Sequence, residues 1–409
     1  MRLKIFDNLQ FNNLHCMRPF HLAITPSVPV WKSDNLLIFD LKFYNGMLLY
    51  TEKWPGDVSC IISLSTEPLP EFGVKALSYN ELPFKCITLI EKELISATHL
   101  QGVSIVLASG DSDNQLHLSK LCKKENIKCV YIIEYIPETR YQIAALSTSN
   151  PIVKIRRFFY IWEKERKRVA AFKLCDGLQS NGVPAHSEYS EVKNNLLFFD
   201  TRVFENQIIK DNELEQRVNY LSEYKPLRIA FSGRLIRIKG ADHLVKFALK
   251  LKQINIPFHL KIYGTGELET EMKKFISKHH LENEVSMLGS VDFYKILIPE
   301  LKQTIDLFVC LHRQSDPSCT YLETLSCGVP IVGYKNRAFS GLLEIFDIGW
   351  GAELNDLDGI CKIVADLNSN RDELIKKSKN SAVFARNHDF EATFQRRLDH
   401  LLSIVNSKK

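Results

Sequence analysis

The chain has 409 residues, more than one ordinary hydrophobic core accommodates, so we expect two domains. Hydrophobic residues make up 45% of it and charged residues 25%, a composition that excludes a disordered or fibrous protein. Its 53 basic and 48 acidic residues give a net charge of +5, too small to favour nucleic acid as the main partner.

In the first half, short apolar runs alternate with charged segments. Strands are predicted at 36–39, 58–64, 103–108 and 128–133, and a helix at 115–124. Strands that alternate with helices indicate βαβ units and a parallel sheet. The pattern of the first sixty residues does not fix the order of their strands.

The second half alternates more regularly. Its periodicity predicts strands at 227–231, 258–263, 285–288, 305–311 and 329–332, with helices at 241–253 and 268–278 among them. The polar stretch 206–225, which ends at Pro226, is the predicted linker. Residues 371–405 are predicted to form helices with polar faces.

Ten cysteines are present, and none forms a Cys-x-x-Cys pair. Several of them, such as Cys129, Cys310 and Cys327, lie in or beside apolar runs. We therefore expect reduced, mostly buried thiols in a cytoplasmic protein, without a disulfide framework or a zinc site. Residues 1–10 lack the apolar core and cleavage site of a secretory signal. No apolar run approaches the roughly 18–20 residues of a membrane span.

Three motifs follow strands of the second half, at the sheet edge where such folds bind ligands. The first is F-S-G-R-L at 231–235, which contains Gly233 and Arg234 and continues to Arg237, Lys239 and Gly240. Cations beside a helix start suit a phosphate, and a solvated basic turn explains the pattern equally well. The second is Y-G-T-G-E at 263–267, whose glycines allow either a close backbone approach to a ligand or simply a tight turn, and the turn is favoured.

The third motif, at 316–332, is the most informative. Small residues at 318–320 open a helix whose first amides are free for an anion, and Glu323 lies about one turn further on. A carboxylate there could accept both hydroxyls of a ribose. The alternative interpretation is an ordinary solvated glutamate.

Together, F-S-G-R-L, K-G, Y-G-x-G-E, L-G-S at 288–290 and P-S-C-T-Y-L-E-T-L-S-C-G-V-P-I-V resemble the donor domain of GT-B glycosyltransferases. The resemblance is to glycosyltransferase family 4, whose members use nucleotide sugars and are usually retaining. It covers residues 226–332, and a fainter resemblance covers 130–135 and 175–182.

The resemblance implies an α/β GT-B fold, in which two Rossmann-like, doubly wound parallel-sheet domains face each other across a cleft. Residues 1–205 would form the acceptor-binding domain, 206–225 the linker and 226–385 the nucleotide-sugar donor domain. Residues 386–409 would form a helix that packs back toward the N-terminal domain.

The resemblance also implies roles for single residues. Arg234 and Lys239 would bind the donor diphosphate and act in catalysis, and Glu323 would bind the ribose. The other implied donor contacts shape the cleft wall, approach the base or cradle the phosphates and the donor sugar: Gly233, Gly264, Gly266, Leu288, Gly289, Ser318, Cys319 and Thr320. Asp316 would replace a family glutamate that is Ser315 here.

Two further departures concern the first half: no Gly-Gly loop is found, and Glu134 stands where many relatives carry a histidine. Glu134 is a catalytic candidate that contacts donor sugar or acceptor hydroxyl, or even acts as base. Alternatively it pairs with Arg140 or a lysine. His312, beside the third motif, either touches a ligand or is a satisfied cleft histidine.

Two D-x-D spacings, at 111–113 and 356–358, are of the kind that holds Mn²⁺ in other glycosyltransferases. Both lie outside the donor motifs, so we interpret them as solvated turns and expect no metal and no cofactor. Charge on the leaving diphosphate would be stabilised by Arg234, Lys239 and the helix start at 318–320. The expected donor is a UDP- or GDP-sugar.

Residues 154–173 interleave basic and aromatic side chains. The segment either lies on an anionic membrane surface, at the inner face of the plasma membrane, or is an amphipathic helix with its aromatic residues in the core. The resemblance implies a glycosyltransferase of the hexosyl type that acts on a glycan or lipid-linked acceptor in bacterial surface polysaccharide synthesis (O-antigen, capsule or exopolysaccharide). The alternatives are a non-catalytic nucleotide-sugar-binding scaffold and a GT-B sugar-nucleotide epimerase.

Overall fold

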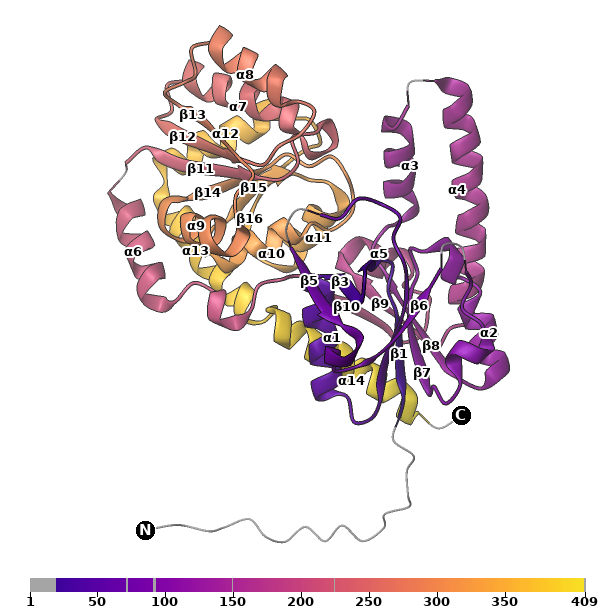
Figure 1. The fold of residues 1–409 in the computed structure, drawn as a ribbon. Helices are drawn as coiled ribbons and strands as arrows, with labels where there is room; N and C mark the ends of the chain where they lie inside the picture. Colours follow the sequence, from indigo (N-terminus) through magenta and orange to yellow (C-terminus); the bar gives the residue numbers. More distant parts are fainter. Residues whose placement is uncertain (1–19, 71–72, 91–92, 149, 224, 408–409) are drawn as a thin grey trace, which may run out of the picture.

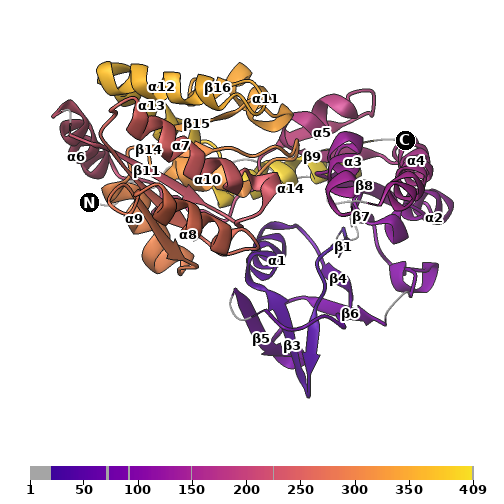
Figure 2. The same ribbon diagram turned by 90° about the horizontal axis from the view of Figure 1, so that it is seen from above.

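The computed structural model describes residues 20–70, 73–90, 93–148, 150–223 and 225–407. Residues 1–10, for which no secretory signal was predicted, and Cys16 lie outside this part of the chain. Figure 1 shows two lobes, each built on a sheet with helices on both faces, and Figure 2 shows them side by side from above. This is the doubly wound α/β architecture that was predicted.

The first sheet has seven parallel strands in the order β10-β9-β8-β7-β1-β4-β6. Their bounds are β1 Leu22–Thr25, β4 Val58–Ser63, β6 Lys85–Leu89, β7 Ile105–Ser109, β8 Lys128–Ile133, β9 Gly177–Asn181 and β10 Asn195–Phe198. Helices α1 (Leu41–Lys53), α2 (Leu118–Glu125), α3 (Pro137–Leu146), α4 (Pro151–Phe172) and α5 (Gly182–Glu188) belong to this lobe.

The run at 36–39 is a strand, as predicted, but it does not enter a βαβ unit. It forms β3 (Leu36–Asp40), which pairs antiparallel with β2 (Trp31–Ser33) and β5 (Val74–Ser78) in a separate small sheet. The parallel pairing indicated for the runs of the first half is therefore wrong for this strand, which lies among the first sixty residues whose strand order was not predicted. The turn between β2 and β3 explains the difference, because Asp34 has the positive φ of 52° that a tight reversal needs.

The second sheet has six parallel strands in the order β13-β12-β11-β14-β15-β16. They are β11 Leu227–Ser232, β12 Phe258–Tyr263, β13 Val285–Gly289, β14 Leu307–Cys310, β15 Ile331–Tyr334 and β16 Gly349–Ala352. The helices between them are α7 (Ala241–Gln253), α8 (Glu269–Lys278), α9 (Ile298–Thr304), α10 (Cys319–Ser326), α11 (Arg337–Ile345) and α12 (Leu357–Ser369).

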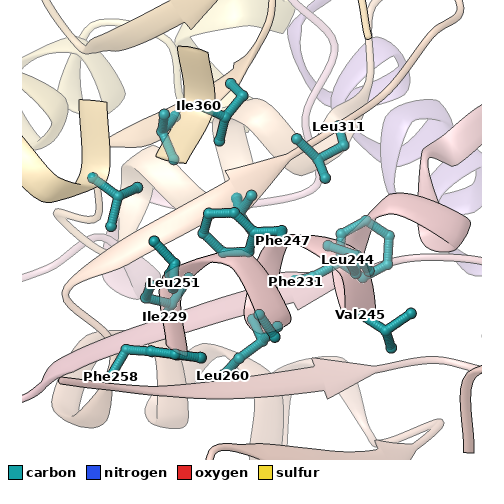
Figure 3. Packing of buried hydrophobic residues seen from close by; sticks show 14 of the residues in the cluster. Ile229, Phe231, Leu244, Val245, Phe247, Leu251, Phe258, Leu260, Leu311 and Ile360 are labelled. Carbon is teal, nitrogen blue, oxygen red and sulfur yellow. The ribbon is translucent and has the colours of Figure 1, made fainter. Parts of the chain in front are cut away.

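The core of the second lobe holds its sheet edge in place. Leu244, Phe247 and Leu251 repeat along one face of α7 and are buried against Ile229 and other apolar strand residues (Figure 3). This packing fixes the turns at the carboxyl ends of β11 and β12, where the first two motifs lie.

The last two helices lie on different lobes. α13 (Arg371–Arg386) packs on α10 and on α6 (Asp211–Ser222), whereas α14 (Phe390–Asn406) crosses to the first lobe and contacts α1, β8 and β10. Much of the stretch 206–225 is thus the helix α6 rather than an extended chain. No helix in the described ranges is long and apolar enough to cross a bilayer.

Candidate functional site

The loops that follow β11, β12 and β13 are joined at the carboxyl edge of the second sheet. The Gly233 amide donates to Tyr263 O at 3.1 Å, and the Gly264 amide donates to Gly289 O at 2.7 Å. A Cβ on Gly264, whose φ is +116°, would lie 2.0 Å from Gly233 O. Glycine is therefore required here because the two loops touch.

Lys239 lies behind these loops, at the end of a short 3-10 turn that Gly240 closes with a φ of +74°. Its ammonium is partly buried, and this burial lowers the pKa of Lys239, while the nearby carboxylates of Asp316 and Glu134 oppose that shift. Arg234 lies close enough to Lys239 to contribute to the same shift in pKa. The structure thus places Arg234, Lys239, Asp316 and Glu134 in one electrostatic neighbourhood.

Helix α10 begins directly after this cluster, with Ser318 at its N-cap. The Ser318 side chain does not cap the helix, so the first amides of α10 depend on another partner. Asp316, two residues earlier, is buried, and burial raises its pKa while Lys239 opposes that shift. An anion bound here would face a helix N-terminus and two cations.

Glu323 is buried in α10, so it is not the solvated glutamate of the alternative interpretation. Its Oε1 accepts from Arg202 Nε at 2.8 Å. The Arg202 guanidinium also lies 3.7 Å from the centre of the Phe293 ring. A ribose that binds Glu323 must therefore share the carboxylate with Arg202 or displace it.

Ser315, which stands where the resemblance expects a glutamate, faces the other lobe. Its hydroxyl donates to Glu138 Oε1 at 2.8 Å, and its amide donates to Gln142 Oε1 at 3.2 Å. Glu138 and Gln142 both belong to α3. Position 315 therefore serves as a contact between the lobes in this structure.

Glu134 lines a cavity of about 300 Å³ in the first lobe, at the carboxyl ends of β1, β7 and β8. Its Oε2 accepts from Asn181 Nδ2 at 3.1 Å. Burial, helped by the charges of Asp200, Asp111 and Asp316, raises the pKa of Glu134 to about 8. The side chain is therefore mostly protonated at pH 7 and can donate a hydrogen bond.

Replacing Glu134 with glutamine is expected to flatten the pH dependence of stability. A carboxyl whose pKa is raised on folding keeps its proton in the folded state, so its contribution to stability is lost as pH rises from about 4.5 to about 8. The free energy of unfolding, measured by denaturant titration at pH 5 to 9, should fall more steeply in the wild type than in Glu134→Gln. Parallel curves for the two proteins would contradict this.

Arg140, which was predicted as one alternative partner of Glu134, does not pair with it. Arg140 pairs with Asp111 at 2.6 Å and with Glu165 at 3.1 Å. The interpretation of 111–113 as a solvated turn is also wrong, because Asp111 accepts the amides of Glu134 and Tyr135. Asp111 thus holds the backbone that carries Glu134.

The second D-x-D and His312 differ from each other in their surroundings. Asp358 is exposed and Asp356 caps α12, as expected of a turn. His312 is buried, and neither ring nitrogen has a hydrogen-bond partner among the described residues, so the prediction of a satisfied histidine is wrong. Burial holds its pKa well below the usual range, which leaves it neutral.

The nine described cysteines are free, and six of them are buried, as predicted.

Three further residues at this site were missed by the sequence reasoning. Lys42, in the first turn of α1, pairs with Asp200 and lies 3.4 Å from Cys319 Sγ in the other lobe. Arg202, described above, follows two residues after Asp200. Asp200 comes shortly after the apolar strand β10, separated from it by Phe199, a signal that could have been used. Nothing in the sequence around Lys42 indicates its neighbour 277 positions away.

Residues 212–387 match the family model described as glycosyl transferases group 1. The match covers somewhat less than half of the chain and lies in the second lobe and the segments that flank it. The matched region contains every predicted donor residue, from Gly233 to Glu323. The predicted GT-B fold is confirmed by its structural relatives.

Among solved structures, this chain is similar to Anabaena HepE, determined in complex with UDP and with UDP-glucose. The TM-score is 0.61, with 11–12% identity over 94% of this chain and 99% of that one. An uncharacterized glycosyltransferase of Haemophilus influenzae is 24% identical over 42% of this chain and 48% of its own length. The amylovoran biosynthesis glycosyltransferase AmsK of Erwinia amylovora is 25% identical over 37% of this chain and 38% of its own length. The chain thus spans less than half the length of either curated relative.

Proposed function

We propose that the protein is a hexosyl-type glycosyltransferase that moves a sugar from a nucleotide-diphosphate sugar to a saccharide or lipid-linked acceptor. One observation carries the proposal: Arg234, Lys239 and Asp316 gather at the N-terminus of α10, within the region that matches the group 1 family. In this proposal residues 226–385 bind the donor and residues 1–205 bind the acceptor, with 206–225 between them.

The arrangement suits the chemistry of the leaving group. When the bond between sugar and diphosphate breaks, negative charge grows on the phosphate oxygens. Arg234, Lys239 and the α10 amides are in place before the reaction, so they stabilise that charge most in the transition state. We propose that they do so without a metal ion. Glu134, protonated at neutral pH, would donate a hydrogen bond to the donor sugar or hold the acceptor hydroxyl.

The remaining donor residues would form the nucleoside side of the site. Glu323 would take the ribose once Arg202 moves or shares its carboxylate. Leu288 and Gly289 would lie near the base, beside the loop of Gly264 and Gly266. The UDP complexes of HepE support UDP over GDP as the nucleotide, and the name of AmsK supports surface polysaccharide synthesis. We propose retention of configuration on the resemblance to family 4.

Thermal unfolding with nucleotides tests this proposal. UDP at about 100 times its dissociation constant should stabilise the protein by roughly 2.7 kcal/mol, and GDP should have a smaller effect. The shift in Tm should disappear in the Arg234→Ala/Lys239→Ala double variant. Turnover of a labelled UDP-sugar with and without acceptor then separates a transferase from an epimerase or a scaffold. The absence of a shift with every nucleotide would overturn the proposal.

We further propose that helix α4 rests on an anionic membrane surface. Figure 1 shows α3 and α4 as adjacent helices that extend beyond the strands of the first sheet. Ile152, Ile155, Phe159 and Trp162 share one exposed face of α4, and Phe159 is 64% exposed. The aromatic residues at 159, 160 and 162 are thus outside the core, contrary to the amphipathic-core alternative. Seven basic residues against two glutamates on α4 provide the complementary charge.

The double variant Ile155→Ser/Phe159→Ser is expected to bind anionic vesicles about tenfold more weakly, because two apolar side chains no longer enter the bilayer. Sedimentation with vesicles that contain phosphatidylglycerol measures this. Ile254→Ser, at an exposed residue of the second lobe, is the control and should bind as the wild type does. Equal sedimentation of all three proteins would refute the proposal.

A further inference from the structure

The cavity beside Glu134 contains two polar groups that lack the partners their burial requires. Tyr50, in α1, is 4% exposed, and its hydroxyl has no hydrogen-bond partner among the described residues. Arg397, in α14, is 6% exposed, and no carboxylate pairs with it in the described part of the chain. A buried cation without an anion and a buried hydroxyl without a partner both carry a desolvation cost.

The surroundings of Arg397 hold its guanidinium in place but leave its charge uncompensated. Its Nε donates to Gln179 Oε1 at 2.8 Å. The guanidinium carbon lies 4.6 Å from the centre of the Phe198 ring, 4.8 Å from that of Phe394 and 5.8 Å from that of Tyr50. These aromatic contacts fix the orientation of the fork, and its terminal nitrogens remain available to a ligand.

The carboxyl groups that line the same cavity do not fill this role. Asp200 pairs with Lys42, Asp111 pairs with Arg140, and Asp40 caps α1 through the Phe43 amide. Glu134 is mostly protonated at neutral pH, since burial raises its pKa to about 8. An anion that enters the cavity therefore meets carboxyls that are already paired, bonded or neutral, together with one unpaired cation.

We propose that this cavity binds a sugar-sized acceptor through an anionic group, which Arg397 and Tyr50 hold, while a hydroxyl of the acceptor faces Glu134. The inference rests on the proposed glycosyl transfer, because it names the acceptor class of that reaction. The cavity volume of about 300 Å³ is at the lower end for small-molecule sites. Phe43, Phe390 and Phe394 provide apolar walls for the faces of a sugar ring. Lys42 connects the cavity to Cys319 at the start of α10.

Calorimetric titrations of the full chain, saturated with UDP, test the inference. The probes are methyl β-D-glucuronide, glucose 1-phosphate and the neutral methyl β-D-glucoside. We expect the glucuronide, the sugar phosphate or both to bind. The neutral glucoside should bind at least about tenfold more weakly than they do, because it cannot make the hydrogen bond to the charged Arg397. The two anionic probes distinguish a carboxylate from a phosphate on the acceptor.

Tyr50→Phe is the decisive variant, because removing an unpartnered hydroxyl leaves the fold intact. It should weaken binding of the anionic probe about tenfold, and Arg397→Gln should abolish it. Tyr44→Phe, on the same helix but packed against Phe39 and Phe84, is the matched control. Equal binding of charged and neutral probes, no effect of Tyr50→Phe, or no binding of any anionic probe while UDP still binds would overturn the inference. Failure of UDP itself to bind would count against the proposed function instead.

Discussion

Replacing Arg234 or Lys239 with alanine is expected to lower kcat/KM by an amount equivalent to about 2–4 kcal/mol. Both side chains lie near Asp316 at the start of α10, where a diphosphate would develop charge. The loss should appear mainly in kcat, since a preorganised cation acts most strongly on the transition state. Steady-state rates with the donor identified by thermal unfolding provide the measurement.

Arg237→Ala is the matched control for this prediction. Arg237 belongs to the same turn, but its side chain is exposed and lies near Asp242 and Glu271. Removing it should leave kcat/KM close to that of the wild type. A near-wild-type rate in Arg234→Ala or Lys239→Ala, or an equal loss in Arg237→Ala, would refute the assignment.

Gly240→Ala is expected to destabilise the protein by about 3 kcal/mol and to weaken nucleotide binding. Gly240 has a φ of +74°, and a Cβ there would lie 2.1 Å from Leu311 O in the loop that follows β14. Relief of this clash must move either that loop or the turn that presents Lys239. Left-handed strain alone costs an alanine roughly 1–2 kcal/mol, so the steric contact should add to it.

Gly102 provides the comparison that separates the two contributions. Its φ of +77° is nearly the same, but a Cβ there meets nothing within 4 Å. Gly102→Ala should therefore cost only the backbone strain, and UDP binding should be unchanged. Denaturant titration gives both free energies. Equal destabilisation by the two substitutions would show that the contact with Leu311 O is relieved without cost.

The sequence predicted the second lobe closely because its elements are regular and local. The helix Ala241–Gln253 and the strand Phe258–Tyr263 end where their periodicity ends. The first lobe was harder, because β1 has only four residues and β3 pairs in a separate antiparallel sheet. The stretch 206–225 was predicted as a linker, and its polar composition did not indicate the helix α6, which needs only a narrow apolar face, around Leu221, to pack.

The candidate site likewise has a part that could be predicted from the sequence and a part that could not. Gly233, Lys239 and Glu323 lie in local motifs, and the resemblance of those motifs to family 4 selected them. The contacts that modify the site come from distant segments: Arg202 reaches Glu323 across 121 positions, and Lys42 reaches Cys319 across 277. The unpartnered hydroxyl of Tyr50 and the uncompensated charge of Arg397 depend on how α1 and α14 pack together, which no spacing in one sequence indicates.

The crossing of α14 to the first lobe has a consequence for biosynthesis. Phe390, Phe394, Leu398 and Leu401 complete a core that otherwise comes from residues before 205. A ribosome makes the first lobe long before this helix, so its apolar face around Met47 has no cover while the second lobe is synthesised and folds. The half of the protein that is made first is therefore the half that finishes folding last. A nascent chain stalled before residue 390 should remain a substrate for chaperones.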